Sequence, residues 1–437
     1  MMKITSMLTA ALAALTLASC SKDDPGTGKG KTVDGTKTTV AIRLDQAQNT
    51  AAISKAAVTS TASDDEKAIK GGTIYAFTEQ GLLESVTTFG AVASGATIDI
   101  ECGVGQRRFY ALVNEPASNF APPSDISSAT TTINTFEKYV YSVSSIADLT
   151  TPSTGFFLTN LERPALVALT EDGPNDVTIT LGRATAKLNV AFTASENLNE
   201  QPNGYLRNVV YKLKSTAKQI YLNSIIETGI FKTPAYGVAY DADNYLISPS
   251  SETSVYTTAV DDDANCFYMT ENSTTASLLR RGPLTYVVIR GTYLPTANYV
   301  DKDDQTQTPP ATAETFYRKT VIDAGGKFVK FANAYCYSEI PELAATGEAY
   351  VTYTDGVCYY PFVIRGNGTD VNAPASYNIV RNYLYKAQII RVEGPGYWSE
   401  DATDPNEGEG NIGGESDMTV TFDVLDWSTG VPQVGGL

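Results

Sequence analysis

The chain has 437 residues, of which 42% are hydrophobic and 19% charged, and its formal net charge at pH 7 is −17. Such a negative charge opposes binding to nucleic acid or to anionic lipid, because like charges repel. The sequence contains no histidine, which removes the usual general base and the commonest metal ligand. Carboxylates alone can hydrolyse glycosides, but the acidic clusters lie in polar, loop-like stretches. We therefore expect no enzyme, no metal and no cofactor.

Residues 1–20 have the pattern of a secretory signal that ends in a cysteine. Lys3 precedes an apolar run from Met7 to Leu17, which is too short to cross a membrane. The small residues before Cys20 resemble the lipobox of a bacterial lipoprotein, in which this cysteine becomes the acylated first residue. The alternative is an ordinary signal peptide that carries a cysteine by chance.

The residues that follow the cysteine carry a second signal. Ser21, Lys22, Asp23 and Asp24 resemble the short lysine-plus-acidic motif that sends lipoproteins of Bacteroidetes to the outer cell surface. A solvated, charged linker is the alternative reading. Residues 21–37 hold too few apolar side chains to fold, so they predict a flexible tether.

The first predicted strand covers residues 38–44, where apolar and polar side chains alternate with a period of two. The apolar face consists of Val40, Ile42 and Leu44. Residues 45–72 are polar and small, and they predict a long loop before the next strand, 73–77. A structureless stretch of this length is uncommon in a compact domain and is often functional.

Short strand candidates bounded by Gly, Pro, Asn or Asp recur along the rest of the chain. Residues 183–192 alternate most cleanly, and residues 196–206 form the best candidate boundary between two domains. Helical periodicity is scarce. Regularly spaced short strands with turn signals predict an all-β protein made of antiparallel sandwiches, and the chain is long enough for two of them.

Four of the five cysteines follow Cys20. Cys336 and Cys358 lie in similar tyrosine-rich segments, and a disulfide could join them across a sheet in an oxidising compartment. The alternative is that all four are buried, reduced thiols. No C-x-x-C motif occurs, which argues against a zinc site.

The last strand follows an acidic, glycine-rich stretch at residues 399–417. Alternation resumes at Met418 and places Val420, Phe422 and Val424 on one face. At Leu425 and Trp427 the apolar side chains switch to the other face, which predicts either a bulge or a strand that serves two surfaces.

The two ends of the chain suggest a mechanism of assembly. A terminal strand behind a long, protease-accessible loop can be removed, which leaves an open groove with unpaired backbone groups. The C-terminal strand of a neighbouring copy could then add to that sheet, and strand addition is an established recognition mode. Head-to-tail repetition of this contact produces an open filament.

Several segments together resemble the Bacteroidetes fimbrillins, the major fimbrial subunits of the short-fimbria (Mfa-like) type that build type V pili. These segments are the lipobox at Cys20, the strand 38–44, the R-A-T-A-K-L-N-V run at 183–190, residues 381–386 and the closing T-V-T-F-D-V-L-D-W at 419–427. The resemblance implies two transthyretin-like antiparallel β-sandwich domains in tandem, here residues 38–198 and 199–437. It also implies export as a surface lipoprotein, cleavage by a trypsin-like protease that removes the first strand, and donor-strand exchange.

Carried over by position, the cleavage falls before Thr73. Well-known members have an arginine there, whereas this loop has none. Lys55 is the nearest equivalent, and Lys67 and Lys70 are later options. Arg43 lies inside the first strand, whose hydrogen bonds would protect it.

The donor strand would be residues 418–427, acting through Val420, Phe422, Val424 and Trp427. The implied partners are other copies of this chain, related fimbrial subunits, a trypsin-like processing protease and the outer membrane, which the lipid anchor reaches. The resemblance also implies host or bacterial surface ligands as partners.

Two alternatives stay open from the sequence. The chain could be an uncleaved anchor subunit or a tip subunit of the same fimbria, or it could be a surface glycan-binding lipoprotein. The aromatic side chains that could stack on sugars are Tyr335, Tyr337, Tyr359, Tyr360, Tyr397 and Trp398, although tyrosines that alternate in strands usually fill sandwiches.

Overall fold

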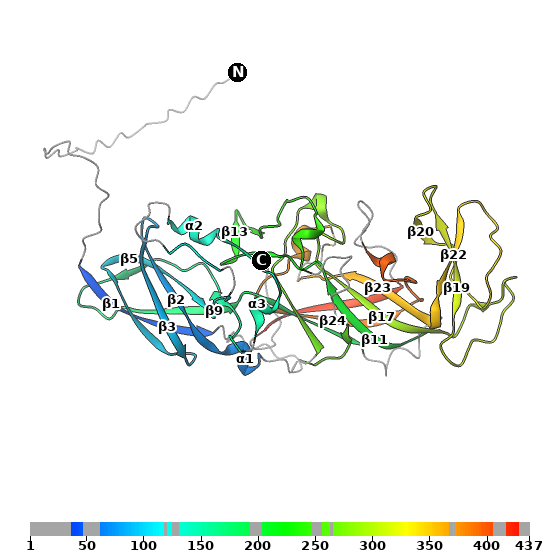
Figure 1. The fold of residues 1–437 in the computed structure, drawn as a ribbon, viewed down its shortest axis with the longest axis horizontal. Helices are drawn as coiled ribbons and strands as arrows, with labels where there is room; N and C mark the ends of the chain where they lie inside the picture. The colour runs from blue at the N-terminus through cyan, green and yellow to red at the C-terminus, as the bar shows by residue number, and fades with distance from the viewer. Residues whose placement is uncertain are drawn as a thin grey trace, which may run out of the picture.

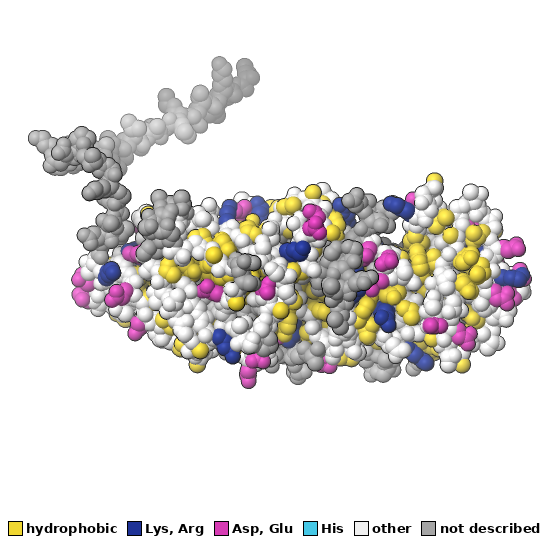
Figure 2. Space-filling view, viewed as in Figure 1, with side chains coloured by type: hydrophobic (Ala, Val, Ile, Leu, Met, Phe, Trp, Pro, Cys, Tyr) yellow, Lys and Arg dark blue, Asp and Glu magenta, His cyan; other side chains and the backbone are white. Residues whose placement is uncertain are grey.

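The computed structural model describes residues 36–46, 62–117, 120–124, 131–151, 153–192, 203–246, 256–262, 265–366, 370, 372–404 and 417–427. The described chain is built mainly of strands, as the alternating patterns predict. Figure 1 shows an elongated body with the first strands at one end. Figure 2 shows charged side chains of both signs spread over the visible face. Within the described ranges, no helix is long and apolar enough to cross a membrane.

The first half of the chain forms an eight-stranded sheet. Its order is β3-β2-β5-β7-β9-β1-β4, and β8 pairs with β5. The strands are β1 (Lys37–Gln46), β2 (Ile69–Thr78), β3 (Leu83–Val92), β4 (Thr97–Gly103), β5 (Gly105–Val113), β7 (Leu158–Asn160), β8 (Val167–Leu169) and β9 (Asp176–Arg183). Strands from across this order, including β1, β2, β5 and β9, bury side chains in one shared core, so the sheet encloses that core.

Helices are few and short in the described chain. They are α1 (Asp64–Lys67), α2 (Ile133–Glu137) and α3 (Ala147–Thr150), with 3-10 turns η2 (Ala242–Asn244), η4 (Ala276–Leu278), η5 (Thr354–Gly356), η6 (Pro374–Tyr377) and η7 (Asp401–Thr403). Two small antiparallel pairs also occur. They are β6 (Val140–Ser142) with β12 (Gln219–Tyr221), and β13 (Ile225–Glu227) with β14 (Ile230–Lys232).

The second half of the chain is a sandwich of two four-stranded sheets. One sheet has the order β16-β10-β24-β25 and the other β15-β11-β17-β23. The strands are β10 (Ala186–Phe192), β11 (Gly204–Lys214), β15 (Thr257–Thr258), β16 (Cys266–Met269), β17 (Tyr286–Pro295), β23 (Val357–Val363), β24 (Tyr383–Val392) and β25 (Met418–Asp426). Both sheets contribute to a single core, with Leu188 and Ile389 from one and Leu213 and Ile289 from the other. The predicted all-β fold of two transthyretin-like sandwiches in tandem is confirmed, and most of the strand pairs are antiparallel, as predicted.

A further five-stranded sheet interrupts the second half between β17 and β23. Its strands are β18 (Tyr299–Val300), β19 (Phe316–Ile322), β20 (Phe328–Phe331), β21 (Cys336–Tyr337) and β22 (Glu348–Tyr353). Figure 1 places it at the end of the body opposite β1. Phe316 and Tyr353 stack at 4.6 Å between ring centroids and join the sandwich core, which attaches this sheet to the second half.

The chain passes from the first sheet to the second between β9 and β10. We expected residues 183–192 to form one strand and the boundary to lie near residue 198. Instead, β9 ends at Arg183, and β10 pairs with β16 and, in parallel, with β24. We therefore propose that the domain boundary lies at residues 184–185. Lys187 and Asn189 on the second face of β10 are also buried. Glu66 and Trp427 lie against Lys187, and Asn189 donates to the carbonyl oxygens of Val260 and Asp262.

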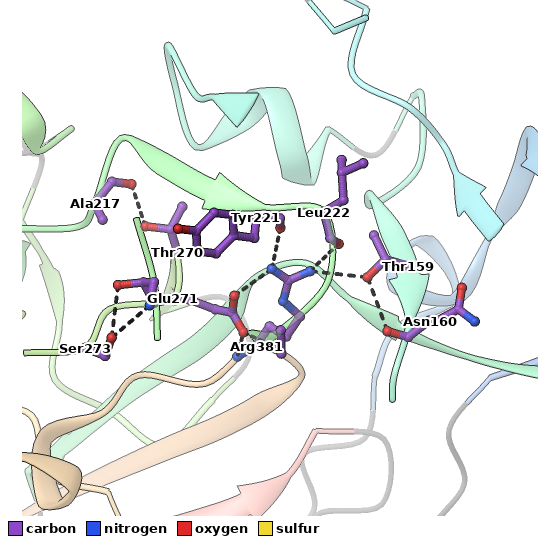
Figure 3. A network of polar contacts seen from close by, with 11 residues as sticks. Thr159, Asn160, Ala217, Tyr221, Leu222, Thr270, Glu271, Ser273 and Arg381 are labelled. Atoms are coloured by element: carbon purple, nitrogen blue, oxygen red, sulfur yellow. Dashed lines mark hydrogen bonds and ion pairs between the residues drawn. The ribbon is translucent and has the colours of Figure 1, made fainter. Parts of the chain in front are cut away.

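Arg381 ties the two halves together through a hydrogen bond to Thr159, and Figure 3 shows it beside its buried ion-pair partner Glu271. Arg381, just before β24, lies 2.6 Å from Glu271, and both side chains are 2% exposed. The same guanidinium donates to Thr159 in β7 of the first half and to the carbonyl oxygens of Tyr221 and Leu222. Removing one partner from such a pair leaves an uncompensated buried charge, at a cost of about 3–5 kcal/mol.

Candidate functional site: the two terminal strands

Strand β1 lies inside its sheet rather than at an edge. It pairs antiparallel with β4 and parallel with β9. Its burial alternates as the sequence predicts, and its inward side chains Val40, Ile42 and Leu44 are fully buried. These side chains share their core with Ile100 of β4 and Ile179 of β9.

Asn175 fixes the start of β1 to the rest of the sheet. Its side-chain amide donates to Thr38 Oγ1 at 2.8 Å and to the carbonyl oxygen of Thr170 at 2.9 Å. The backbone N–H of Ala41 donates to the carbonyl oxygen of Asn175. The first strand is thus held by hydrogen bonds along both of its edges.

Strand β25 has the opposite character, because it is the last strand in its sheet. It pairs antiparallel with β24, from Tyr383 opposite Asp426 to Val392 opposite Met418. Met418 and Val424 are buried, whereas Val420 and Phe422 are half-buried against the second core. The predicted alternation is therefore present, and the outer edge of β25 pairs with no strand of the described chain.

The end of β25 serves two cores. Val424 packs in the core of the second half, whereas Leu425 and Trp427 pack in the core of the first half, the one that holds β1. The register with β24 is regular here, and its shift lies between Ile389 and Arg391. The change of face at Leu425 and Trp427 therefore reflects a strand that serves two surfaces, and not a bulge at that point.

Trp427 lies in a cage of aromatic and cationic side chains. Its indole stacks on Tyr268, with 5.6 Å between centroids, and meets Phe156 edge-on at 6.1 Å. The Arg183 guanidinium lies 4.6 Å from the ring centroid, and Lys187 Nζ lies 5.7 Å from it. Such cation–π contacts strengthen when they are desolvated, and Trp427 is fully buried.

Glu66 in α1 connects this cage to the N-terminal part of the chain. Its carboxylate accepts hydrogen bonds from Trp427 Nε1 at 3.2 Å and from the Tyr268 hydroxyl at 2.8 Å. It pairs with Lys187 Nζ at 2.9 Å, and both side chains are 2% exposed. It also closes a capping box with Ser63, which orders the short helix.

The sequence patterns did not indicate a role for Glu66 at this site. The local signal was a serine followed three residues later by glutamate, which is the pattern of a capping box. That pattern predicts a helix start, but it gives no indication of Trp427, which lies 361 residues further along the chain. The structure also shortens the expected loop, since α1 and the first residues of β2 lie within 45–72.

The structure places three of the four candidate cleavage residues in hydrogen-bonded backbone. Arg43 is in β1, opposite Thr97 and Thr178. Lys67 ends α1, and the backbone N–H of Lys70 in β2 donates to Asn114. Proteases prefer exposed loop tips, so these positions are poor substrates in the folded chain. Cys20, residues 21–24 and Lys55 lie outside the described residues.

Cys336 and Cys358 are present as free, buried thiols, and the disulfide considered between them is not formed. Burial raises the pKa of each thiol to about 12. Cys102 is also buried, whereas Cys266 is half-buried. Two of the tyrosines considered for sugar stacking, Tyr337 and Tyr360, are fully buried in the interior.

Comparisons with known proteins match both ends of the described chain. Residues 38–176 match the family model for the major fimbrial subunit protein FimA. Residues 351–431 match the model for major fimbrial subunit protein type IV, fimbrillin, C-terminal. The first match begins one residue into β1, and the second contains β25. No curated protein matches the chain.

Solved structures show the same fold. A fimbrilin from Porphyromonas gingivalis is 16% identical, with a TM-score of 0.50 over 90% of this chain and 98% of that chain. A candidate cell adhesion protein from Parabacteroides distasonis is 14% identical, with a TM-score of 0.50 over 90% of this chain and 99% of that one. By its two family matches, the chain belongs to the Bacteroidetes fimbrillin family of major fimbrial subunits, cell-surface proteins of the cell-adhesion type.

Proposed function

We propose that this fimbrial subunit is a stalk subunit that polymerises by donor-strand exchange. In this proposal the chain is exported as a lipoprotein acylated at Cys20, a trypsin-like protease cuts it at Lys55, and β1 leaves together with the lipid. The observation that carries the proposal is the position of β1, a fully integrated interior strand at the very start of the described chain.

Removal of β1 would create a well-defined acceptor groove. The edges of β4 and β9 would lose their hydrogen-bond partners, and three fully buried side chains would leave their pockets. Refilling those three pockets contributes roughly 5–9 kcal/mol, at about 1.5–3 kcal/mol for each side chain. Such a groove strongly favours an incoming strand.

The C-terminal strand supplies a matching donor. Val420, Phe422 and Val424 have the same spacing of two as Val40, Ile42 and Leu44, so one strand can replace the other in the same register of pockets. Among the described residues, strand β25 pairs on one edge only, which limits the number of hydrogen bonds that must break before it moves.

Leu425 and Trp427 give cleavage a means to control the donor. Both side chains share a core with Val40, Ile42 and Leu44. Loss of β1 therefore removes part of the core that holds the end of β25. In this mechanism the intact precursor keeps its donor strand docked, and the departure of β1 after cleavage loosens it.

The test is N-terminal sequencing of protein sheared from cells, run beside an unboiled denaturing gel. A new N-terminus after Lys55, with a ladder of heat-sensitive oligomers, is the expected result. A Lys55→Ala variant should abolish both, whereas Lys70→Ala, the matched control inside β2, should change neither. An intact lipidated Cys20 with one monomer band would instead indicate an anchor subunit or a glycan-binding lipoprotein.

A further inference from the structure

A groove of about 810 Å³ lies where the two halves of the chain meet. It is lined by α2, residues 161–163, the hairpin β13–β14 with the two residues before it, and the segment 380–383 that leads into β24. This volume lies within the range of roughly 300–1,000 Å³ that is typical of small-molecule sites. None of these lining residues belongs to β1 or β25.

Asn223 is the most informative residue of this groove. It is 5% exposed, and neither its side-chain oxygen nor its nitrogen has a hydrogen-bond partner in the described part of the chain. Buried polar atoms in native proteins are nearly always paired, and each exception calls for an explanation. An amide that lines a groove with both a donor and an acceptor unused is suited to a ligand that offers both.

Arg381 gives the groove a second unused donor. Its two terminal nitrogens are occupied by Glu271, Thr159 and the carbonyl oxygens of the β12 end, as Figure 3 shows. Its Nε is buried and has no partner among the described residues. This nitrogen keeps one N–H donor that the described residues leave unused.

Two ion pairs lie among the charged side chains of the groove. Lys138 lies 2.8 Å from Glu227, and Arg163 lies 2.7 Å from Glu137. The hydrogen bond from Lys138, with a second from Lys232, lowers the pKa of Glu227 to about 2. Three acidic and three basic side chains line the groove, which therefore carries no strong preference for an anion or a cation.

We infer that this groove binds a neutral saccharide. Neighbouring sugar hydroxyls both donate and accept, so two of them satisfy the oxygen and nitrogen of Asn223, and a third oxygen accepts from Arg381 Nε. Tyr383 and Ile226, which is 56% exposed, line the same groove and offer apolar surface to the C–H face of a sugar ring. A peptide backbone can also donate to and accept from the Asn223 amide. It does not, however, hold a third oxygen for Arg381 Nε on the same rigid unit, as a sugar ring does.

This inference goes beyond strand exchange and does not depend on it. Figure 1 shows β13 near α2, toward the middle of the body and away from β1. The groove is formed within a single copy of the chain that still contains β1, so its test uses the uncleaved, unpolymerised chain. Failure of polymerisation would leave the inference untouched, and failure of sugar binding would leave strand exchange untouched.

The experiment is ligand-observed NMR with four disaccharides and tetraglycine. Lactose and N,N′-diacetylchitobiose represent animal glycans, and cellobiose and maltose represent plant glucans, so the arm that binds identifies the source. We expect at least one disaccharide to bind. Asn223→Leu should weaken that binding about tenfold or more, without lowering Tm, because the substitution removes two unpaired buried atoms.

Asn203→Leu, which lies outside the groove, is the matched control and should bind as the native chain does. The inference is overturned if no disaccharide binds, or if Asn223→Leu binds as tightly as the control. Binding of tetraglycine through Asn223, with no response to any sugar, would assign the groove to peptides and would also overturn it.

Discussion

The indole nitrogen of Trp427 donates a hydrogen bond to Glu66 Oε2 at 3.2 Å, and this contact joins the end of the last strand to the helix that precedes the second strand. Glu66 also pairs with Lys187 at the start of β10. One carboxylate thus connects the N-terminal segment, the junction of the two sheets and the C-terminal strand.

Glu66→Gln tests the strength of this connection. The substitution keeps the shape of the side chain but leaves the Lys187 ammonium buried without its counter-charge. We expect the free energy of unfolding to fall by about 3–5 kcal/mol, the usual cost of breaking a buried ion pair. Urea denaturation measures the loss.

Asp64→Asn is the matched control, because it removes an exposed carboxylate from the same short helix. It should change stability by less than about 1 kcal/mol. Adding Lys187→Met to Glu66→Gln should recover part of the loss. Equal stabilities for Glu66→Gln and Asp64→Asn would contradict the role given to Glu66.

The apolar face of β1 is expected to carry much of the stability of the first half. Ile42→Ala deletes fully buried atoms and should cost about 2–5 kcal/mol. Thr39→Ala, on the exposed face of the same strand, should stay within about 0.5 kcal/mol of the native chain. Denaturation of both variants decides the matter, since similar midpoints would mean that β1 is not docked as described.

Local alternation predicted the inward face of β1 and of β25 because a strand repeats every two residues, whatever it pairs with. The same alternation did not predict which sheet a strand would join. Residues 183–192 alternate without interruption in sequence, yet β9 and β10 belong to different sheets. The pairing partners of a strand depend on contacts across the whole chain, which the two-residue alternation does not encode.

The buried polar groups were harder to predict than the strands. Lys187 falls on the polar face of the alternating segment 183–192, but Glu66 and Trp427 cover that face of β10 in the structure. A lysine in that position requires a counter-charge, which Glu66 provides. The spacing of Ser63 and Glu66 predicts where the helix starts, but it does not predict that Glu66 pairs with Lys187.

The four described cysteines should differ sharply in reactivity. Burial raises the pKa of Cys336 and Cys358 to about 12 and that of Cys102 to about 11, so these thiols stay protonated and unreactive at pH 8. In a chain that lacks Cys20, a thiol reagent should modify Cys266 first and the other three cysteines only on unfolding. Rapid labelling of Cys336 in the folded chain would contradict this arrangement.

The same thiols predict a loss of stability in alkali. Each has an ordinary pKa of 9.0, and in the folded chain this value is raised. Above about pH 9 the unfolded chain loses these protons while the folded chain keeps them, so stability falls as pH rises from about 9 to 12. Urea midpoints across this range measure the slope. A Cys336→Ala, Cys358→Ala variant should reduce the slope most between about pH 9 and 10, because burial also raises the pKa of tyrosines such as Tyr353 and Tyr360, which add to the slope at higher pH.

Trp427 offers a direct reading of the link between cleavage and release of the donor strand. The chain has two tryptophans, so Trp398→Phe leaves Trp427 as the only tryptophan emitter. Its full burial predicts a blue-shifted emission in the precursor. Cleavage at Lys55 alone should not change this emission, because the hydrogen bonds of β1 hold the strand in place.

Removal of the cut strand, by gel filtration in mild denaturant followed by dilution, should shift the emission to the red as the shared core opens. A synthetic peptide of residues 36–46 should restore the blue-shifted emission, whereas the same peptide with Ile42→Asp should not, because it buries an unpaired carboxylate. Emission that stays blue after β1 has left would show that Trp427 is seated independently. Release of β25 would then need a trigger other than cleavage.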